Sequence, residues 1–124
     1  MGLEKLQGQL SAFISTWTED ATASGAVATA THAAESNKSH YITGFSVSSY
    51  DGSAGAGTST IEIKDDTDVI MTIYKDNGVA ADGGEVTHSF SSPIQITEGN
   101  ACSISINNSS TYDSNAANLW GFTS

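Results

Sequence analysis

The fold is decided between residues 41 and 74, in a segment that begins Tyr41-Ile-Thr-Gly-Phe-Ser-Val-Ser-Ser-Tyr50. Bulky residues alternate with small polar ones in this stretch, which is the pattern of a strand with one buried face. The alternation continues in Ile61-Glu-Ile-Lys64 and, after the polar turn Lys64-Asp-Asp-Thr-Asp68, in Val69-Ile-Met-Thr-Ile-Tyr74. We therefore expect three consecutive half-buried strands. The buried face of the first should carry Tyr41, Thr43, Phe45 and Val47.

Shorter alternating stretches, separated by turn residues, flank this segment on both sides. A polar turn at 35–39 should precede it, and Asn77-Gly78 is a strong turn dipeptide after it. Pro93 cannot donate to a strand ladder, so it should separate two neighbouring strands. We expect the flanking strands at Ala26–Ala33, Glu85–Phe90, Ile94–Ile96, Ala101–Ile106 and Asn118–Thr123. About seven or eight short strands with this turn chemistry predict an all-β sandwich or barrel.

The N-terminal segment has a different periodicity. Its apolar residues fall at spacings of three and four, as in an amphipathic helix: Leu3, Leu6, Leu10, Phe13 and Trp17. This apolar stripe predicts a short helix or an arm, covered either by its own domain or by a neighbouring subunit. The run from Thr18 to Gly25 is typical of a linker. We therefore divide the chain into residues 1–25, a helix or arm with its linker, and a sandwich domain at 26–124.

Composition limits the classes of partner. The 124 residues suit one domain, and 14 acidic residues against 4 basic ones give a net charge of −10. Nucleic-acid binding depends on Lys and Arg that neutralise phosphates, and the sequence contains no Arg. We find no basic amphipathic helix, no secretory signal pattern and no apolar run of about 18 residues. The sequence thus predicts no nucleic-acid partner and no membrane association.

Asp65, Asp66 and Asp68, close to Glu62, are the calcium candidate, because calcium binds six to eight oxygen atoms. The spacing lacks the glycine and terminal Glu of an EF-hand loop, and Asp is common in turns, so a solvated hairpin turn is the alternative. Cys102 alternates with two isoleucines, which predicts a buried, inert thiol.

The remaining residues suggest no catalytic chemistry. His32, His40 and His88 have no i, i+4 pairing, and a single cysteine gives no Cys-x-x-Cys motif, so we predict no zinc site. His88 shares a strand face with Val86 and Phe90 and should be half-buried against a neighbour. There is no Gly-x-Ser-x-Gly nucleophile motif. We expect a protein that is not an enzyme and needs no cofactor.

Several motifs between residues 30 and 124 together resemble small structural proteins of tailed bacteriophages, of the capsid decoration (cement) type. The motifs are His40-Tyr-Ile-Thr-Gly44, Ile61-Glu-Ile-Lys-Asp-Asp-Thr-Asp-Val-Ile70, Pro93-Ile94, Thr97-Glu-Gly-Asn-Ala101 and Trp120-Gly-Phe-Thr123. The resemblance implies a jelly-roll-like β-sandwich, commonly a homotrimer, docked on the outer surface of the capsid. It implies no catalytic residue.

The expected function is that of a decoration protein, made in the host cytoplasm, that binds the major capsid protein and stabilises the head. The N-terminal residues Leu3, Leu6, Leu10, Phe13 and Trp17 would then be interface candidates, as an arm onto the capsid or an adjacent copy. One alternative is a head-fibre, tail or host-attachment protein of the virion. Another, of a different class, is a carbohydrate-binding β-sandwich module.

Overall fold

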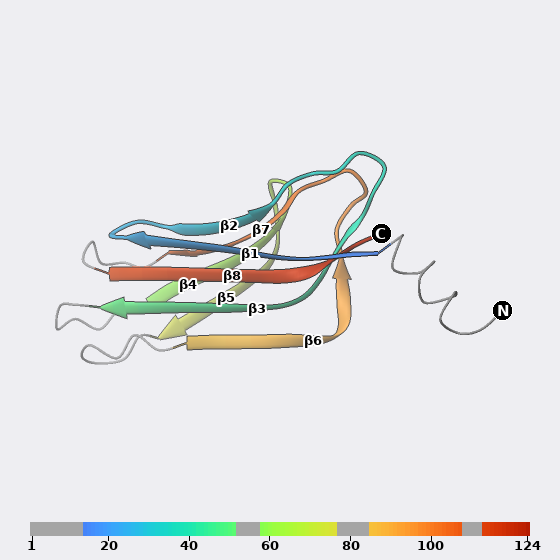
Figure 1. Cartoon of the computed structure of the whole chain (residues 1–124). Helices are drawn as coiled ribbons and strands as arrows, with labels where there is room; N and C mark the ends of the chain where they lie inside the picture. Colours follow the sequence, from blue (N-terminus) through green and yellow to red (C-terminus); the bar gives the residue numbers. More distant parts are fainter. Residues whose placement is uncertain (1–13, 52–57, 77–84, 108–112) are drawn as a thin grey trace.

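The computed structural model describes residues 14–51, 58–76, 85–107 and 113–124, and within these ranges the regular structure is entirely β (Figure 1). Eight strands form two four-stranded sheets. In chain order they are β1 (Ser15–Ser24), β2 (Ala28–His32), β3 (His40–Asp51), β4 (Thr58–Asp65), β5 (Asp68–Asp76), β6 (Glu85–Gln95), β7 (Cys102–Asn107) and β8 (Asp113–Thr123).

The strand order is that of a jelly roll. One sheet has the order β1-β8-β3-β6 and the other β2-β7-β4-β5. Strands pair from the chain ends inward, with β1 against β8, β2 against β7, β3 against β6 and β4 against β5, all antiparallel. A long hairpin wound into two packed sheets has this pattern. The predicted all-β, jelly-roll-like sandwich is confirmed.

The core lies between the sheets and consists of alternate residues from the inner strands. Its largest fully buried side chains are Phe45, Ile42, Ile61, Ile63, Ile96, Ile104, Ile106 and Leu119. Burial of each such side chain stabilises the fold by about 1.5–3 kcal/mol relative to an exposed one. Within one sheet, the neighbouring strands β4 and β7 each turn every second residue over most of their length into this core.

The inward face of β3 differs from the predicted one in its first half. Ile42 and His40 point into the sandwich, whereas Tyr41 and Thr43 are only half-buried. The register to both neighbours shifts between Ile42 and Gly44, which marks a β-bulge. A bulge inserts one residue and so reverses the facing of all residues on one side of it. Phe45 and Val47, beyond the bulge, face inward as predicted.

A second irregularity lies at Pro93. We predicted two strands here, and the structure has one, β6, whose register against β3 jumps from Ser89 to Ile94. The residues between them bulge out of the ladder, and the strand bends sharply in Figure 1. Pro93 therefore interrupts the pairing, as expected of a residue without an N–H donor, without ending the strand.

The sandwich begins earlier than predicted. Ser15–Ser24 is strand β1, paired with β8 along its whole length, so residues 18–25 are not a linker. Trp17 belongs to this strand and packs against the core, rather than lying on a helix or arm. Every second residue of β1 from Trp17 to Ala23 is half-buried, a strand period in which small alanines fill the last two positions. The other four residues of the predicted stripe, Leu3, Leu6, Leu10 and Phe13, lie outside the described residues.

Gly121 is where β8 passes closest to its neighbour. A Cβ atom at this position would lie 2.0 Å from the carbonyl oxygen of Tyr41 and 2.9 Å from the Trp17 ring. Because the first contact is with backbone, we expect Gly121→Ala to lower the free energy of unfolding by about 2–3 kcal/mol. Chemical denaturation monitored by Trp fluorescence measures this. Ser114→Ala at an exposed position of the same strand is the control, and equal stability of the two variants would contradict the packing described here.

Candidate functional site

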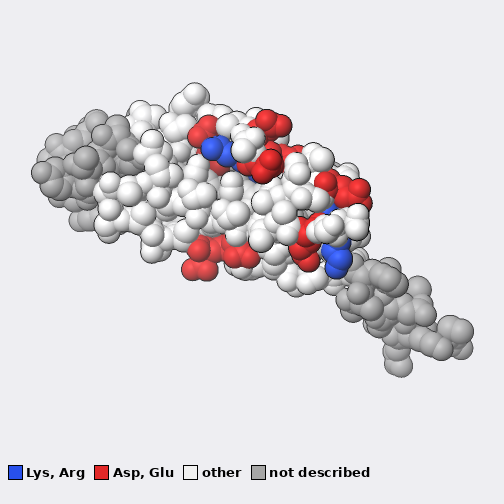
Figure 2. Space-filling view, turned by 90° about the horizontal axis from the view of Figure 1, so that it is seen from above, with Lys and Arg blue, Asp and Glu red and all other residues white. Residues whose placement is uncertain are grey.

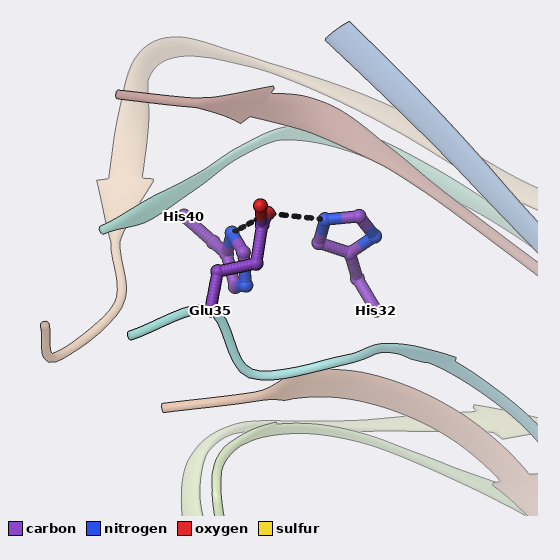
Figure 3. A group of neighbouring side chains, drawn as sticks. All are labelled: His32, Glu35 and His40. Atoms are coloured by element: carbon purple, nitrogen blue, oxygen red, sulfur yellow. Dashed lines mark ion pairs between the residues drawn. The ribbon is translucent and has the colours of Figure 1, made fainter. Parts of the chain in front are cut away.

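Two histidines and a glutamate lie close together at the connection between β2 and β3. His32 is the last residue of β2, and His40 is the first of β3. Between them a turn closes with the Lys38 amide donating to the Glu35 carbonyl at 3.2 Å, and Asn37 adopts a left-handed conformation (φ 63°) that Asn tolerates. The turn directs Glu35 toward both imidazole rings (Figure 3). We call His32, Glu35 and His40 the His–Glu cluster.

His40 is completely buried and its tautomer follows from its partners. Its Nε2 lies 2.8 Å from the Ala33 carbonyl oxygen, which can only accept, so Nε2 carries the proton. Nδ1 lies 2.7 Å from Thr123 Oγ1. That hydroxyl accepts from the Trp17 indole N–H at 3.1 Å and thus donates its own proton to Nδ1. Both ring nitrogens of His40 therefore have hydrogen-bond partners, and Nδ1 also lies near Glu35.

His32 is held by one carboxylate and faces another. Its Nδ1 lies 2.9 Å from Glu19 Oε1 on β1, and its ring stacks on Trp17 at 4.1 Å between centroids, with 8° between the planes. The other nitrogen, Nε2, is buried and has no hydrogen-bond partner. It lies 3.6 Å from Glu35 Oε2, and His40 Nδ1 lies 3.9 Å from the same oxygen.

This cluster was not predicted from the sequence. We predicted no zinc site because the histidines lack an i, i+4 spacing, but that spacing applies to helices. Here the spacing is His-x-x-Glu-x-x-x-x-His across a strand, a turn and a strand. Only the turn at 35–38, itself predicted, could have indicated that the ends of β2 and β3 approach each other.

Asp65, in the acidic hairpin between β4 and β5, forms hydrogen bonds to a second turn. Asp65 Oδ2 accepts from the Thr97 amide at 3.0 Å and the Thr97 hydroxyl at 2.7 Å, and Oδ1 accepts from Asn100 Nδ2 at 2.9 Å. The carboxylate thereby holds the 97–100 turn. Among the described residues, Asp65, Asp66 and Asp68 do not form a convergent group of possible metal ligands, whereas the His–Glu cluster does. Asp65 thus has a structural role in the hairpin, and the calcium candidate stays a prediction.

These hydrogen bonds predict a pH-dependent stability. Burial raises the pKa of Asp65, but the hydrogen bonds from Asn100 and Thr97 outweigh it and lower the pKa below its ordinary value. A carboxyl with a lowered pKa stabilises the fold above its unfolded pKa of about 4 and ceases to do so as the pH falls through the folded pKa. We expect Asp65→Asn to cost about 1 kcal/mol at pH 7, because solvent screens the half-exposed carboxylate.

The difference between wild type and Asp65→Asn should shrink as the pH falls below about 4. Denaturant unfolding at pH 7 and at pH 3 measures it. Asp68→Asn, which removes the same charge from the same hairpin, is the control. A cost of Asp65→Asn that does not depend on pH would contradict the assigned role of the carboxylate.

Cys102 is a buried free thiol, as predicted. Burial, followed by the charges of Asp65 and Glu19, raises its pKa to about 12. The thiolate is the reactive form, so the native thiol should be nearly inert at neutral pH. We expect iodoacetamide at pH 8 to leave native Cys102 unmodified for hours and to alkylate it within minutes in denaturant, as read by mass spectrometry. Rapid alkylation of the native protein would contradict this burial.

The two long sides of the sandwich differ in how they are closed. On one side β1 lies against β2, while on the other β5 and β6 make at most marginal contact (Figure 1). His88 lies on the core-facing side of β6, beside Phe45 and Phe90, yet it is exposed rather than half-buried as predicted. We call the uncovered residues here the open strip: Met71, Ile73, Val86, His88 and Phe90.

Charge is spread thinly over the surface. Figure 2 shows one face on which acidic side chains lie in small groups, some beside lysines, between uncharged residues. The open strip itself contains no carboxylate. Tyr74, on the outward side of the edge strand β5, is 74% exposed, and Val69 and Ile70 of the same strand are also exposed. Apolar contact surface therefore accompanies the β5–β6 side.

Comparison with known proteins supports the fold. No family model matches the sequence, and no curated protein matches it. The structure is similar to a chain of the capsid asymmetric unit of cyanophage Pam1, with a TM-score of 0.53 and 16% identity over 89% of this chain and 84% of that one. It is also similar to part of dimeric latent PorU from Porphyromonas gingivalis, with a TM-score of 0.50 and 12% identity over 89% of this chain and 13% of that one.

At these identities the likeness concerns the fold alone. The jelly-roll arrangement thus occurs both in a small capsid chain and within a much larger bacterial protein. Within the described residues, no helix is long and apolar enough to cross a membrane.

Proposed function

We propose that this chain is a structural protein of a tailed-bacteriophage virion, which decorates the outer surface of the head and stabilises it by bridging subunits of the major capsid protein. The observation that carries the proposal is a jelly-roll fold shared, over most of both chains, with a capsid chain of similar length. A protein of this size can stabilise a shell without a catalytic cleft, since binding to the assembled state alone shifts the equilibrium away from disruption.

Self-association is part of the proposal. The open strip keeps core-facing residues of both sheets, including Phe90 and Ile73, only half-buried. Each copy carries a net charge of −10, so two copies meet favourably only across a surface without carboxylates. The open strip is such a surface. We propose that it contacts a neighbouring copy in a homotrimer, whose threefold symmetry matches local axes of an icosahedral shell.

The carbohydrate-binding alternative requires aromatic faces that are open to solvent. The described rings Tyr41 and Phe122 are parallel, with 9° between their planes, but they stack on each other at 4.8 Å. Rings stacked face to face do not form the coplanar platform that a sugar would use, and Tyr74 is a strongly exposed ring that glycan binding would test. That the protein has no enzymatic activity stays a prediction, as do the absence of nucleic-acid partners and the role of the N-terminal residues.

The first test is the molar mass of the purified protein by light scattering, together with co-sedimentation with heads that lack the decoration. We expect a mass of three chains and saturable binding to the heads. A protein that ignores heads but binds fibres or tails would overturn the decoration role and favour another virion position. A monomer that binds glycans and no virion part would overturn the virion proposal altogether.

The open strip is tested by a charge placed within it. His88→Glu adds a carboxylate at an exposed position and should convert the trimer to a monomer. Because the position is exposed, the variant should still unfold cooperatively as a folded monomer. Thr31→Glu, at an exposed position of β2 on the opposite side, should leave the mass unchanged. A trimer that survives His88→Glu would exclude this strip as the contact.

A further inference from the structure

We propose that the His–Glu cluster is a binding site for one divalent transition-metal ion, of which Zn²⁺ is the probe. Two imidazole nitrogens and one carboxylate oxygen lie within 4.8 Å of one another. This donor set suits zinc and similar ions, which bind neutral imidazole and carboxylate at about 2.0–2.2 Å and take a water molecule in the fourth position of an open site. The inference does not depend on the proposed function.

The hydrogen bonds around the cluster orient both rings as a metal would require. His32 uses Nδ1 toward the Glu19 carboxylate, and His40 uses Nε2 toward the Ala33 carbonyl oxygen. A metal-binding histidine almost always donates its second ring N–H to a carboxylate or a backbone carbonyl, which fixes the tautomer. The other nitrogen of each ring lies near the same oxygen, Glu35 Oε2, at 3.6 Å for His32 Nε2 and 3.9 Å for His40 Nδ1. Of these two nitrogens, His32 Nε2 has no hydrogen-bond partner, whereas His40 Nδ1 already accepts from Thr123.

The second observation is an unsatisfied atom. His32 Nε2 is buried and has no hydrogen-bond partner, and buried polar atoms of this kind are rare in folded proteins. Its separation of 3.6 Å from Glu35 Oε2 is too long for a hydrogen bond. It is close to the spacing of about 3.3–3.5 Å between two ligands of a tetrahedral ion with bonds of this length. A metal ion would satisfy Nε2 without moving the strand.

Binding of a metal ion would break one hydrogen bond, that between Thr123 and His40. The Thr123 hydroxyl is 2.7 Å from His40 Nδ1, so a metal at Nδ1 would replace that hydrogen bond. The hydroxyl would keep its contact with the Trp17 indole N–H. A bound ion would join the end of β2, the Glu35 turn and the start of β3, and would therefore raise the stability of this end of the sandwich.

The test is titration of tag-free protein with Zn²⁺ by calorimetry, with thermal unfolding in parallel. We expect one ion per chain and a thermal midpoint that rises with zinc concentration. Glu35→Gln should weaken binding by more than about tenfold. Co²⁺ in place of zinc should give visible absorption bands of a nitrogen-containing site of low coordination number, which the variant loses.

A matched control separates this site from other acidic residues. Glu98→Gln, in an exposed turn, should bind zinc as the wild type does. His32→Gln should bind no better than Glu35→Gln. The proposal is overturned if the wild type takes up no zinc, or if Glu98→Gln loses as much affinity as Glu35→Gln.

Discussion

The pairing of the first described strand with the last is the constraint on which the rest of the structure depends. β1 and β8 match over ten residues, from Ser15 with Thr123 to Ser24 with Ser114. This pairing closes a loop of nearly the whole chain, so its entropic cost is met only when both sheets are formed around it. It also brings the Trp17 indole N–H to the hydroxyl of Thr123. The same hydroxyl is the hydrogen-bond partner of His40 Nδ1.

The fold class was predictable because most strands carry bulky residues with a period of two. β4, β5 and β7 lie within two or three residues of their predicted positions. β1 was not predictable in the same way, because its inward residues after Trp17 include Ala21 and Ala23, whose small side chains bury little apolar area. The prediction of which residues of β3 face inward was wrong in the first half of the strand for another reason. A bulge at Gly44 depends on its fit to β6 and β8, which no local pattern reveals.

The His–Glu cluster was less predictable than the fold. His32 and His40 come together through a turn that the sequence does indicate. The orientation of their rings, however, depends on residues far along the chain. Glu19 fixes one ring, and Thr123 contacts the other. The pairing of β8 with β3 brings Thr123 there, and the packing of β1 against β2 across the two sheets brings Glu19, so both contacts are properties of the topology. Asp65 shows the same limit, since its partners lie more than thirty residues away.

The two long sides of the sandwich differ in the contacts that cover the core. On the β1–β2 side, stacked rings and the hydrogen bond between His32 and Glu19 close the gap within one chain, and His32 Nε2 is buried beside them. On the β5–β6 side, Phe45 is buried, but Phe90 beside it is only half-buried and His88 is exposed. Apolar area left in water by folding remains available to association. The chain's own side chains therefore close the β1–β2 side, whereas the β5–β6 side keeps apolar area at the surface.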